Sequence, residues 1–137
     1  MTLTNCKSRL MAFFSLACAS SLTWGQPTDP CETQRGTIEI NACAKQQLDA
    51  QDRILNTTYQ NLLAQLSTDD LDGNRQVTKQ KLVRAQRLWV QFRDADCAAQ
   101  ENVYDGGTVH TAIYLQCLRD HTIQRIKDLD PVKWQGG

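Results

Sequence analysis

The sequence has few histidines, no excess of charge of either sign and, after residue 25, no long hydrophobic run. It contains two histidines, and 15 basic residues stand against 15 acidic ones. Nucleic-acid binding requires a surface rich in lysine and arginine, and a balanced composition gives no support for it. A membrane-spanning helix needs about 20 consecutive apolar residues, which the chain lacks beyond residue 25. We therefore predict a mature protein that binds no nucleic acid and has no transmembrane span.

Motifs for catalysis and metal binding are missing as well. His110 and His121 are 11 residues apart, which on a helix separates them by about 16 Å, too far to share a metal ion or a proton. No pair of cysteines has the C-x2–4-C spacing of structural zinc sites. No nucleophile, base and acid form a recognisable catalytic set. The sequence therefore predicts no enzymatic activity, no metal and no cofactor.

Residues 1–25 have the pattern of an N-terminal export signal. Two basic residues, Lys7 and Arg9, precede an almost uncharged segment over residues 10–22. That segment is about 13 residues long, which is too short for a comfortable membrane span and typical of a cleaved signal peptide. We expect a single mature domain over residues 26–137, located in the periplasm or secreted.

Two alternatives to this processing stay open. Cleavage could follow Ala19 instead of Gly25, although Gly25 leaves a signal segment of more usual length. Acylation of Cys18 would make the protein a lipoprotein, but the residues before it fit the acylation pattern poorly. Removal of residues 1–25 leaves 112 residues with 13 basic and 15 acidic side chains, a net charge of −2. A mildly acidic domain is weakly compatible with a cationic protein partner.

The predicted mature chain retains four of the six cysteines: Cys31, Cys43, Cys97 and Cys117. An even number of cysteines in an exported protein indicates disulfides, and four cysteines allow three pairings. A structural zinc site is the competing interpretation, and it is weaker because the cysteines are widely spaced and histidines are scarce. Two disulfides are therefore the prediction.

Glycines divide the mature chain into three long segments, at Gly36, at Gly73 and at the pair of residues 106 and 107. Within each segment apolar residues recur at helical spacing, and no strand-like alternation competes. The predicted helices lie near residues 37–66, 74–101 and 108–129. The fold class is therefore all-α, a disulfide-bonded bundle of three main helices.

The short connection over residues 67–74 predicts that the first two helices form a long antiparallel hairpin. The third helix then folds back along the second. Cys97 lies ten residues before Gly107 and Cys117 ten residues after it, so antiparallel packing places these two cysteines opposite each other. Pairing of Cys97 with Cys117 leaves Cys31 to pair with Cys43, and we favour this connectivity over the other two.

Polar residues interrupt the apolar stripes of the first two helices at matching depths. The rows are Asp52, Asn56 and Tyr59 on the first helix, and Gln86, Trp89 and Arg93 on the second. A carboxylate among leucines is costly unless it is paired, and the guanidinium of Arg93 is the natural partner for Asp52. We interpret these residues as a structural polar network that fixes helix register, in preference to an exposed binding groove.

Several motifs resemble those of the LprI family of lysozyme inhibitors, a bacterial domain of mostly secreted proteins. In chain order they are Cys31, "TIEINAC" (37–43), Asp52 before "LNTTY" (55–59), "AQRLWVQFRDADC" (85–97), "GGT" (106–108), Cys117, and Thr122, Arg125 and Leu129. The resemblance covers nearly the whole predicted mature chain. It implies a helical, disulfide-bonded envelope protein whose relatives include inhibitors of lysozyme, and it carries over no catalytic residues.

We therefore predict a protein-binding module whose partner is lysozyme or another peptidoglycan-active enzyme. Such a module needs a protruding loop, preferably with charge that complements the partner. Two loops qualify by their acidic or aromatic residues: the first has Asp69, Asp70 and Asp72, and the second has Tyr104 and Asp105. Solvated turns without a partner are the simpler interpretation of both loops. The alternative function is an envelope interaction or immunity protein with a partner other than lysozyme.

Overall fold

The protein is an all-α bundle, as a computed structural model shows for residues 31, 33–67 and 73–134. Helix α1 covers Thr37–Gln65, α2 covers Asn74–Val103 and α3 covers His110–Asp128. A short 3-10 helix, η1, covers Pro131–Trp134. The described residues contain no strand. The predicted fold class is confirmed, and the predicted signal peptide over residues 1–25 lies outside the described part of the chain.

The boundaries between the helices depend on two glycines with a left-handed backbone. Gly73 precedes α2 with φ of 69°, and Gly106 lies in the loop between α2 and α3 with φ of 80°. Side chains are strained at such angles, which explains why glycine occupies these turns. The loop is closed by the Gly107 amide, which donates to the carbonyl of Tyr104 at 3.0 Å. This turn delays the third helix, which begins at His110, two residues later than predicted.

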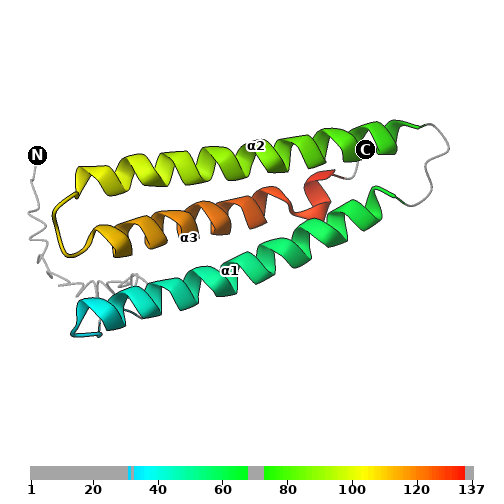
Figure 1. Cartoon of the computed structure of the whole chain (residues 1–137). Helices are drawn as coiled ribbons and strands as arrows, with labels where there is room; N and C mark the ends of the chain where they lie inside the picture. The colour runs from blue at the N-terminus through cyan, green and yellow to red at the C-terminus, as the bar shows by residue number, and fades with distance from the viewer. Residues whose placement is uncertain (1–30, 32, 68–72, 135–137) are drawn as a thin grey trace, which may run out of the picture.

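Helix α3 lies between α1 and α2 along the bundle (Figure 1). Helices α1 and α2 run antiparallel, as the hairpin prediction requires, and α3 runs alongside α1 in the same direction. The most extensive helix pairings are α1 with α3 and α2 with α3. The sequence predicted only the second of these two pairings. The central element of the bundle is therefore α3, which packs against both α1 and α2.

Two clusters of buried side chains form the core. The cluster nearer the α1–α2 connection consists of Leu55, Leu62, Leu66, Leu82 and Leu129. Trp134 of η1 packs against it, and its indole nitrogen donates to the carbonyl of Asp128 at 3.1 Å. The second cluster, toward the α2–α3 loop, consists of Leu48, Cys97, Cys117 and Leu118. The second cluster takes residues from all three helices, and the first joins α1 and α2 to Leu129, which directly follows α3.

Two disulfides cross-link the bundle, with the predicted connectivity. Cys97 of α2 is bonded to Cys117 of α3, with Cα atoms 5.6 Å apart. Cys31 is bonded to Cys43 of α1, with Cα atoms 5.7 Å apart. Both separations lie within the usual range for a disulfide. The first bridge ties α2 to α3 inside the core, while the second fastens the segment before α1 to the first turns of that helix.

These bridges predict the thiol content of the mature protein. Alkylation of the denatured, unreduced protein should label none of Cys31, Cys43, Cys97 and Cys117, and alkylation after reduction should label all four. Intact-mass spectrometry reads the number of labels directly. Peptide mapping of the unreduced protein should recover Cys97 joined to Cys117. Four labels before reduction would contradict both the bridges and the predicted oxidising location.

Candidate functional site

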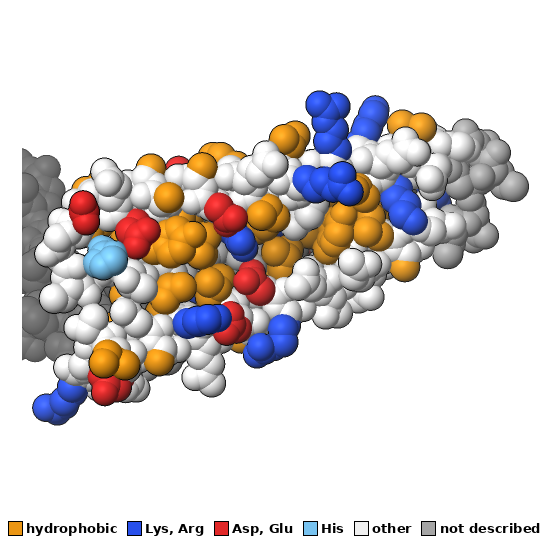
Figure 2. Space-filling view, viewed as in Figure 1, with side chains coloured by type: hydrophobic (Ala, Val, Ile, Leu, Met, Phe, Trp, Pro, Cys, Tyr) orange, Lys and Arg blue, Asp and Glu red, His pale blue; other side chains and the backbone are white. Residues whose placement is uncertain are grey.

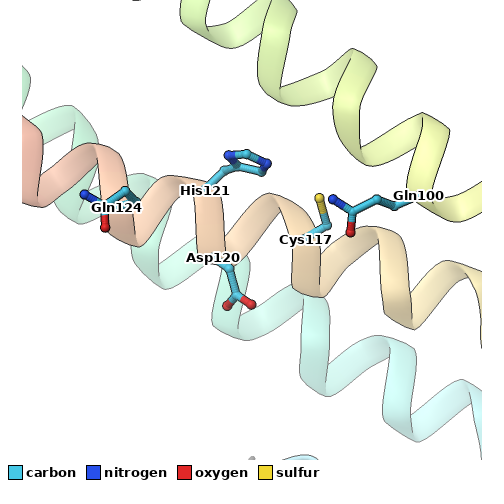
Figure 3. A pocket seen from close by; sticks show the side chains of 5 residues that line it. All are labelled: Gln100, Cys117, Asp120, His121 and Gln124. Carbon is cyan, nitrogen blue, oxygen red and sulfur yellow. The ribbon is translucent and has the colours of Figure 1, made fainter.

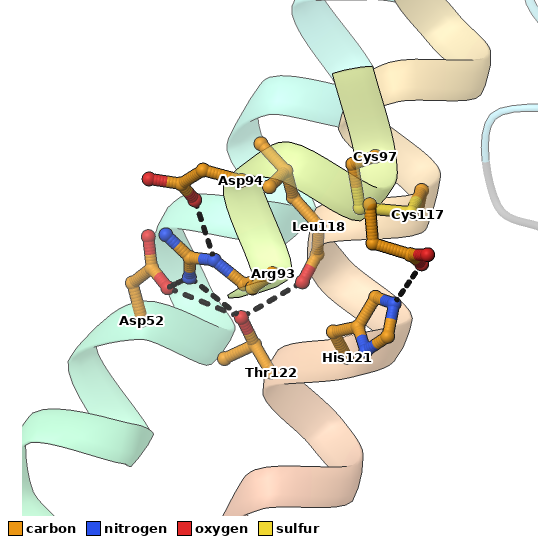
Figure 4. Close-up of polar contacts among 9 residues, drawn as sticks. Asp52, Arg93, Asp94, Cys97, Cys117, Leu118, His121 and Thr122 are labelled. Carbon is orange, nitrogen blue, oxygen red and sulfur yellow. Dashed lines mark hydrogen bonds and ion pairs between the residues drawn. A yellow bond between two sulfur atoms is a disulfide. The ribbon is translucent and has the colours of Figure 1, made fainter. Parts of the chain in front are cut away.

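Arg93 joins all three helices at the middle of the bundle. Its guanidinium Nη1 donates to Asp52 Oδ1 of α1 at 3.2 Å and to Thr122 Oγ1 of α3 at 3.1 Å (Figure 4). Its Nε donates to Asp94 Oδ1 at 3.0 Å. The Arg93 side chain is 14% exposed, against 38% for Asp52. The charged pair is thus shielded on the arginine side and reached by water on the carboxylate side.

Thr122 is the buried partner of this cluster. Its hydroxyl donates to the carbonyl of Leu118 at 2.8 Å and accepts from Arg93, and the residue has no exposed surface. A buried hydroxyl costs free energy unless it is hydrogen-bonded, and both functions of this hydroxyl are satisfied. We call Asp52, Arg93 and Thr122 the central polar cluster.

An aromatic ring extends the cluster along α2. The guanidinium carbons of Arg93 and Arg125 lie 5.1 and 5.7 Å from the centroid of the Trp89 ring. Arg125 also donates from Nε to Gln86 Oε1 at 2.9 Å, which joins α3 to α2. Burial lowers the pKa of the Arg125 guanidinium, while the charges of Asp128 and Tyr59 act in the opposite direction. Contacts with two guanidinium groups help to hold the Trp89 ring where it packs against the leucine cluster.

The remaining two residues of the predicted network lie further from the centre. Tyr59 is half-buried and packs against the leucine cluster; burial raises the pKa of its phenol, and Arg87 and Arg125 partly oppose that rise. Asn56 is exposed on α1, and within the described part of the chain no hydrogen bond joins it to Asp52 or Arg93. Residues of α3 therefore contact Asp52, Gln86, Trp89 and Arg93. Asn56 lies outside this network.

Sequence reasoning missed the contribution of α3. Thr122 and Arg125 hold partners on the other helices, and Arg119 Nη1 donates to Gln47 Oε1 of α1. A signal was present, because Arg119 and Thr122 interrupt the apolar stripe of the third helix as Asp52 interrupts that of the first. The predicted network paired only the first two helices and so had no place for these residues.

The central polar cluster has the properties of an interhelical clasp. Its hydrogen bonds join side chains within the bundle, and its members belong to helices that pack against the core. Paired charges of this kind specify register more than they add stability. A binding site requires groups that a partner can reach, and such groups lie elsewhere on the molecule.

The loop between α2 and α3 offers such groups. Val103 is 78% exposed and Tyr104 is 47% exposed, and Val109 at the other side of the loop is 49% exposed. Asp105 is also exposed, and its carboxylate accepts from the Gly106 amide at 2.9 Å. At the base of the loop, His110 Nδ1 and Glu101 Oε1 lie 3.0 Å apart, so the loop starts from a fixed stem. Asp69, Asp70 and Asp72, in the other predicted contact loop, lie outside the described residues.

A pocket opens on the α3 surface beside the buried disulfide (Figure 3). It is lined by Gln100, Cys117, Asp120, His121 and Gln124. His121 Nε2 lies 2.9 Å from Asp96 Oδ2, and its ring meets Phe92 edge-on with centroids 5.6 Å apart. His121 also lies close to the sulfurs of Cys97 and Cys117. Because these sulfurs are bonded to each other, they are not available as thiolate ligands for a metal ion.

Comparisons with known proteins agree with the resemblance seen in the motifs. The family model described as "Lysozyme inhibitor LprI" matches residues 28–129. An uncharacterized protein of Rhizobium meliloti (strain 1021) is 29% identical over 119 residues, which cover 83% of this chain and 86% of that protein. No solved structure matches. Among the described residues, no helix is both long enough and apolar enough to cross a membrane.

Proposed function

The chain belongs to the LprI family of lysozyme inhibitors, and on this premise we propose that it is an exported protein that binds a lysozyme through the loop between α2 and α3. The loop would enter the active-site cleft and exclude the peptidoglycan substrate. The observation that supports this site is the exposure of Val103, Tyr104 and Val109 together at one end of a disulfide-bonded bundle. The protein would act by binding alone and needs no cofactor.

The chemistry of the loop suits a protein partner. Tyrosine is enriched among the residues that dominate protein interfaces, because its ring buries a large area while its hydroxyl keeps a hydrogen bond. Lysozymes cleave glycosidic bonds with two carboxyl groups in an open cleft, and many are cationic. Asp105 at the tip would favour approach to a cationic surface. The Cys97–Cys117 bridge and the Glu101–His110 pair hold the stem, so little ordering of the loop is needed on binding.

Turnover of labelled peptidoglycan by lysozyme, measured with increasing amounts of mature protein, tests the proposal. We expect saturable inhibition. The double variant Tyr104→Ser/Asp105→Lys should weaken inhibition by about 100-fold, because an anchor is lost and the charge at the tip is reversed. Arg53→Ala, an exposed substitution on α1, is the matched control and should inhibit like the wild type. Circular dichroism should show the same helix content in all three proteins.

Two results would overturn the proposal. Absence of inhibition at large molar excess, with lysozymes of more than one structural type, would remove lysozyme as the partner. Full inhibition by the Tyr104→Ser/Asp105→Lys variant would keep lysozyme as the partner but remove the α2–α3 loop as the contact. In the first case, capture of a different envelope protein would favour the interaction or immunity role.

A further inference from the structure

Helix α2 carries a second apolar row that its own bundle does not cover. Its large members are Val77, Leu88, Phe92 and Val103, which are 46%, 54%, 56% and 78% exposed. Between them lie three exposed alanines, Ala85, Ala95 and Ala99. With the exposed Lys81, the row advances by three or four residues at every step from 77 to 103, the spacing of one helix face. We call these residues the outer row of α2.

The outer row is separate from the face that α2 presents to its own bundle. That inner face contains Leu82, Trp89, Arg93 and Cys97, which pack against α1 and α3. Of the outer row, Phe92 reaches α3, where its ring meets that of His121 edge-on. A surface helix normally has one apolar face and one polar face. A helix with a second apolar face indicates a second packing partner.

The order of residues in the outer row is nearly the same in both directions. Counted outward from position 90, Leu88 corresponds to Phe92, Ala85 to Ala95, and Val77 to Val103. Two such helices packed antiparallel about a twofold axis therefore place bulky residues against bulky residues and Ala85 against Ala95, while Lys81 lies opposite Ala99. The alanines allow the two backbones to approach closely on either side of the central Leu88–Phe92 contacts.

The charges of α2 favour the same antiparallel arrangement. Residues 74–88 contain five basic side chains and no acidic one: Arg75, Lys79, Lys81, Arg84 and Arg87. Residues 89–105 contain four acidic side chains, Asp94, Asp96, Glu101 and Asp105, against the single base Arg93, which is held by Asp52. Figure 2 shows this separation along α2, with basic side chains toward one end and acidic ones toward the other. Antiparallel pairing sets opposite charges near each other, whereas parallel pairing sets like charges together.

We propose that a second copy of this chain covers the outer row, in a twofold-symmetric dimer whose two α2 helices pack antiparallel and centre near residue 90. The row spans 26 residue steps from Val77 to Val103, about 39 Å of helix. A contact of that length is of the order needed for a specific interface of about 1,200 Å² or more. In such a dimer Val103 packs against Val77 of the second copy, while the rest of each α2–α3 loop, with Tyr104 and Val109, lies at opposite ends of the dimer and remains open.

Sedimentation equilibrium of the mature protein tests the dimer, independently of any lysozyme. We expect dimers at micromolar concentration. Leu88→Glu should raise the dimer dissociation constant by about 100-fold or more, because it puts a carboxylate into the centre of an apolar contact. Ile54→Glu on α1 is the matched control, since Ile54 is 48% exposed and lies outside the outer row. It should leave the dimer intact, and circular dichroism should show both variants folded.

Cross-linking tests the direction of the pairing. Single variants Ala85→Cys and Ala95→Cys are prepared separately, mixed, and treated with a short thiol-specific bismaleimide. The antiparallel arrangement predicts efficient cross-linking in the mixture and little in either variant alone. A monomeric wild type at about 100 µM, or a dimer that Leu88→Glu leaves unchanged, would overturn the proposal. Preferred cross-linking of Ala85→Cys to itself would overturn the antiparallel arrangement.

Discussion

Replacing Cys97 and Cys117 together by alanine should lower the free energy of unfolding by about 3–4 kcal/mol. The bridge joins residues 20 apart, and its removal gives the unfolded chain the corresponding loop entropy. Both cysteines also belong to the buried cluster with Leu48 and Leu118, so the two lost sulfurs leave a void in the core. Urea denaturation, followed by circular dichroism with oxidised wild type as reference, measures the difference.

The other disulfide is the matched control for this prediction. Cys31 and Cys43 are 12 residues apart, and their bridge fastens the segment before α1 without joining two helices of the bundle. Replacing both by alanine should lower the free energy of unfolding by less, about 2–3 kcal/mol, because the closed loop is shorter and the main core stays filled. A larger loss of unfolding free energy from this pair than from Cys97 and Cys117 would contradict the placement of the Cys97–Cys117 bridge in the core.

Arg93→Ala should lower the free energy of unfolding by about 2–4 kcal/mol. The variant loses the contacts to Asp52 and Thr122 and leaves the Thr122 oxygen with one partner fewer in a place that water does not reach. It also removes the cation above the ring of Trp89. The expected loss is below that of a fully buried ion pair, because the Asp52 side chain is 38% exposed and retains some solvation. Thermal and urea unfolding measure the change.

Two further variants separate the contributions of Arg93. Arg93→Met keeps most of the packed stem and should recover part of the loss, since similar hydrophobic volume often replaces a buried ion pair at little cost. Arg53→Ala removes an exposed arginine from α1 and should change stability by less than about 0.5 kcal/mol. If Arg93→Ala were as mild as Arg53→Ala, the central polar cluster would have no role in holding the helices together.

The helices and disulfides were predictable because they follow from local patterns. Apolar spacing and the glycines at the turns predicted the three helices to within two residues at every end. The turn near Gly107 then placed Cys97 opposite Cys117, as the structure shows. Two residues at equal distances along the chain from a short turn face each other across it, and a single sequence contains those distances.

The order of the helices in space was harder to predict, because it depends on which side chains form hydrogen bonds and pack together across the helices. Asp52 and Arg93 were predicted to meet, and they do, but Thr122 completes their cluster from a third helix. Asn56 has the right helical spacing for the same face and is nevertheless exposed. Spacing gives the direction of a side chain on its own helix, whereas the position of the neighbouring helix decides whether that direction is buried.

Hydrogen exchange of the mature protein, with and without saturating lysozyme, reports both whether the two proteins bind and where. We expect slowed exchange in the α2–α3 loop and its stem, residues 101–110, with little change around Asp52 and Arg93. Unchanged exchange throughout the chain at saturating lysozyme, or slowed exchange confined to the middle of α1 and α2, would contradict lysozyme binding through this loop.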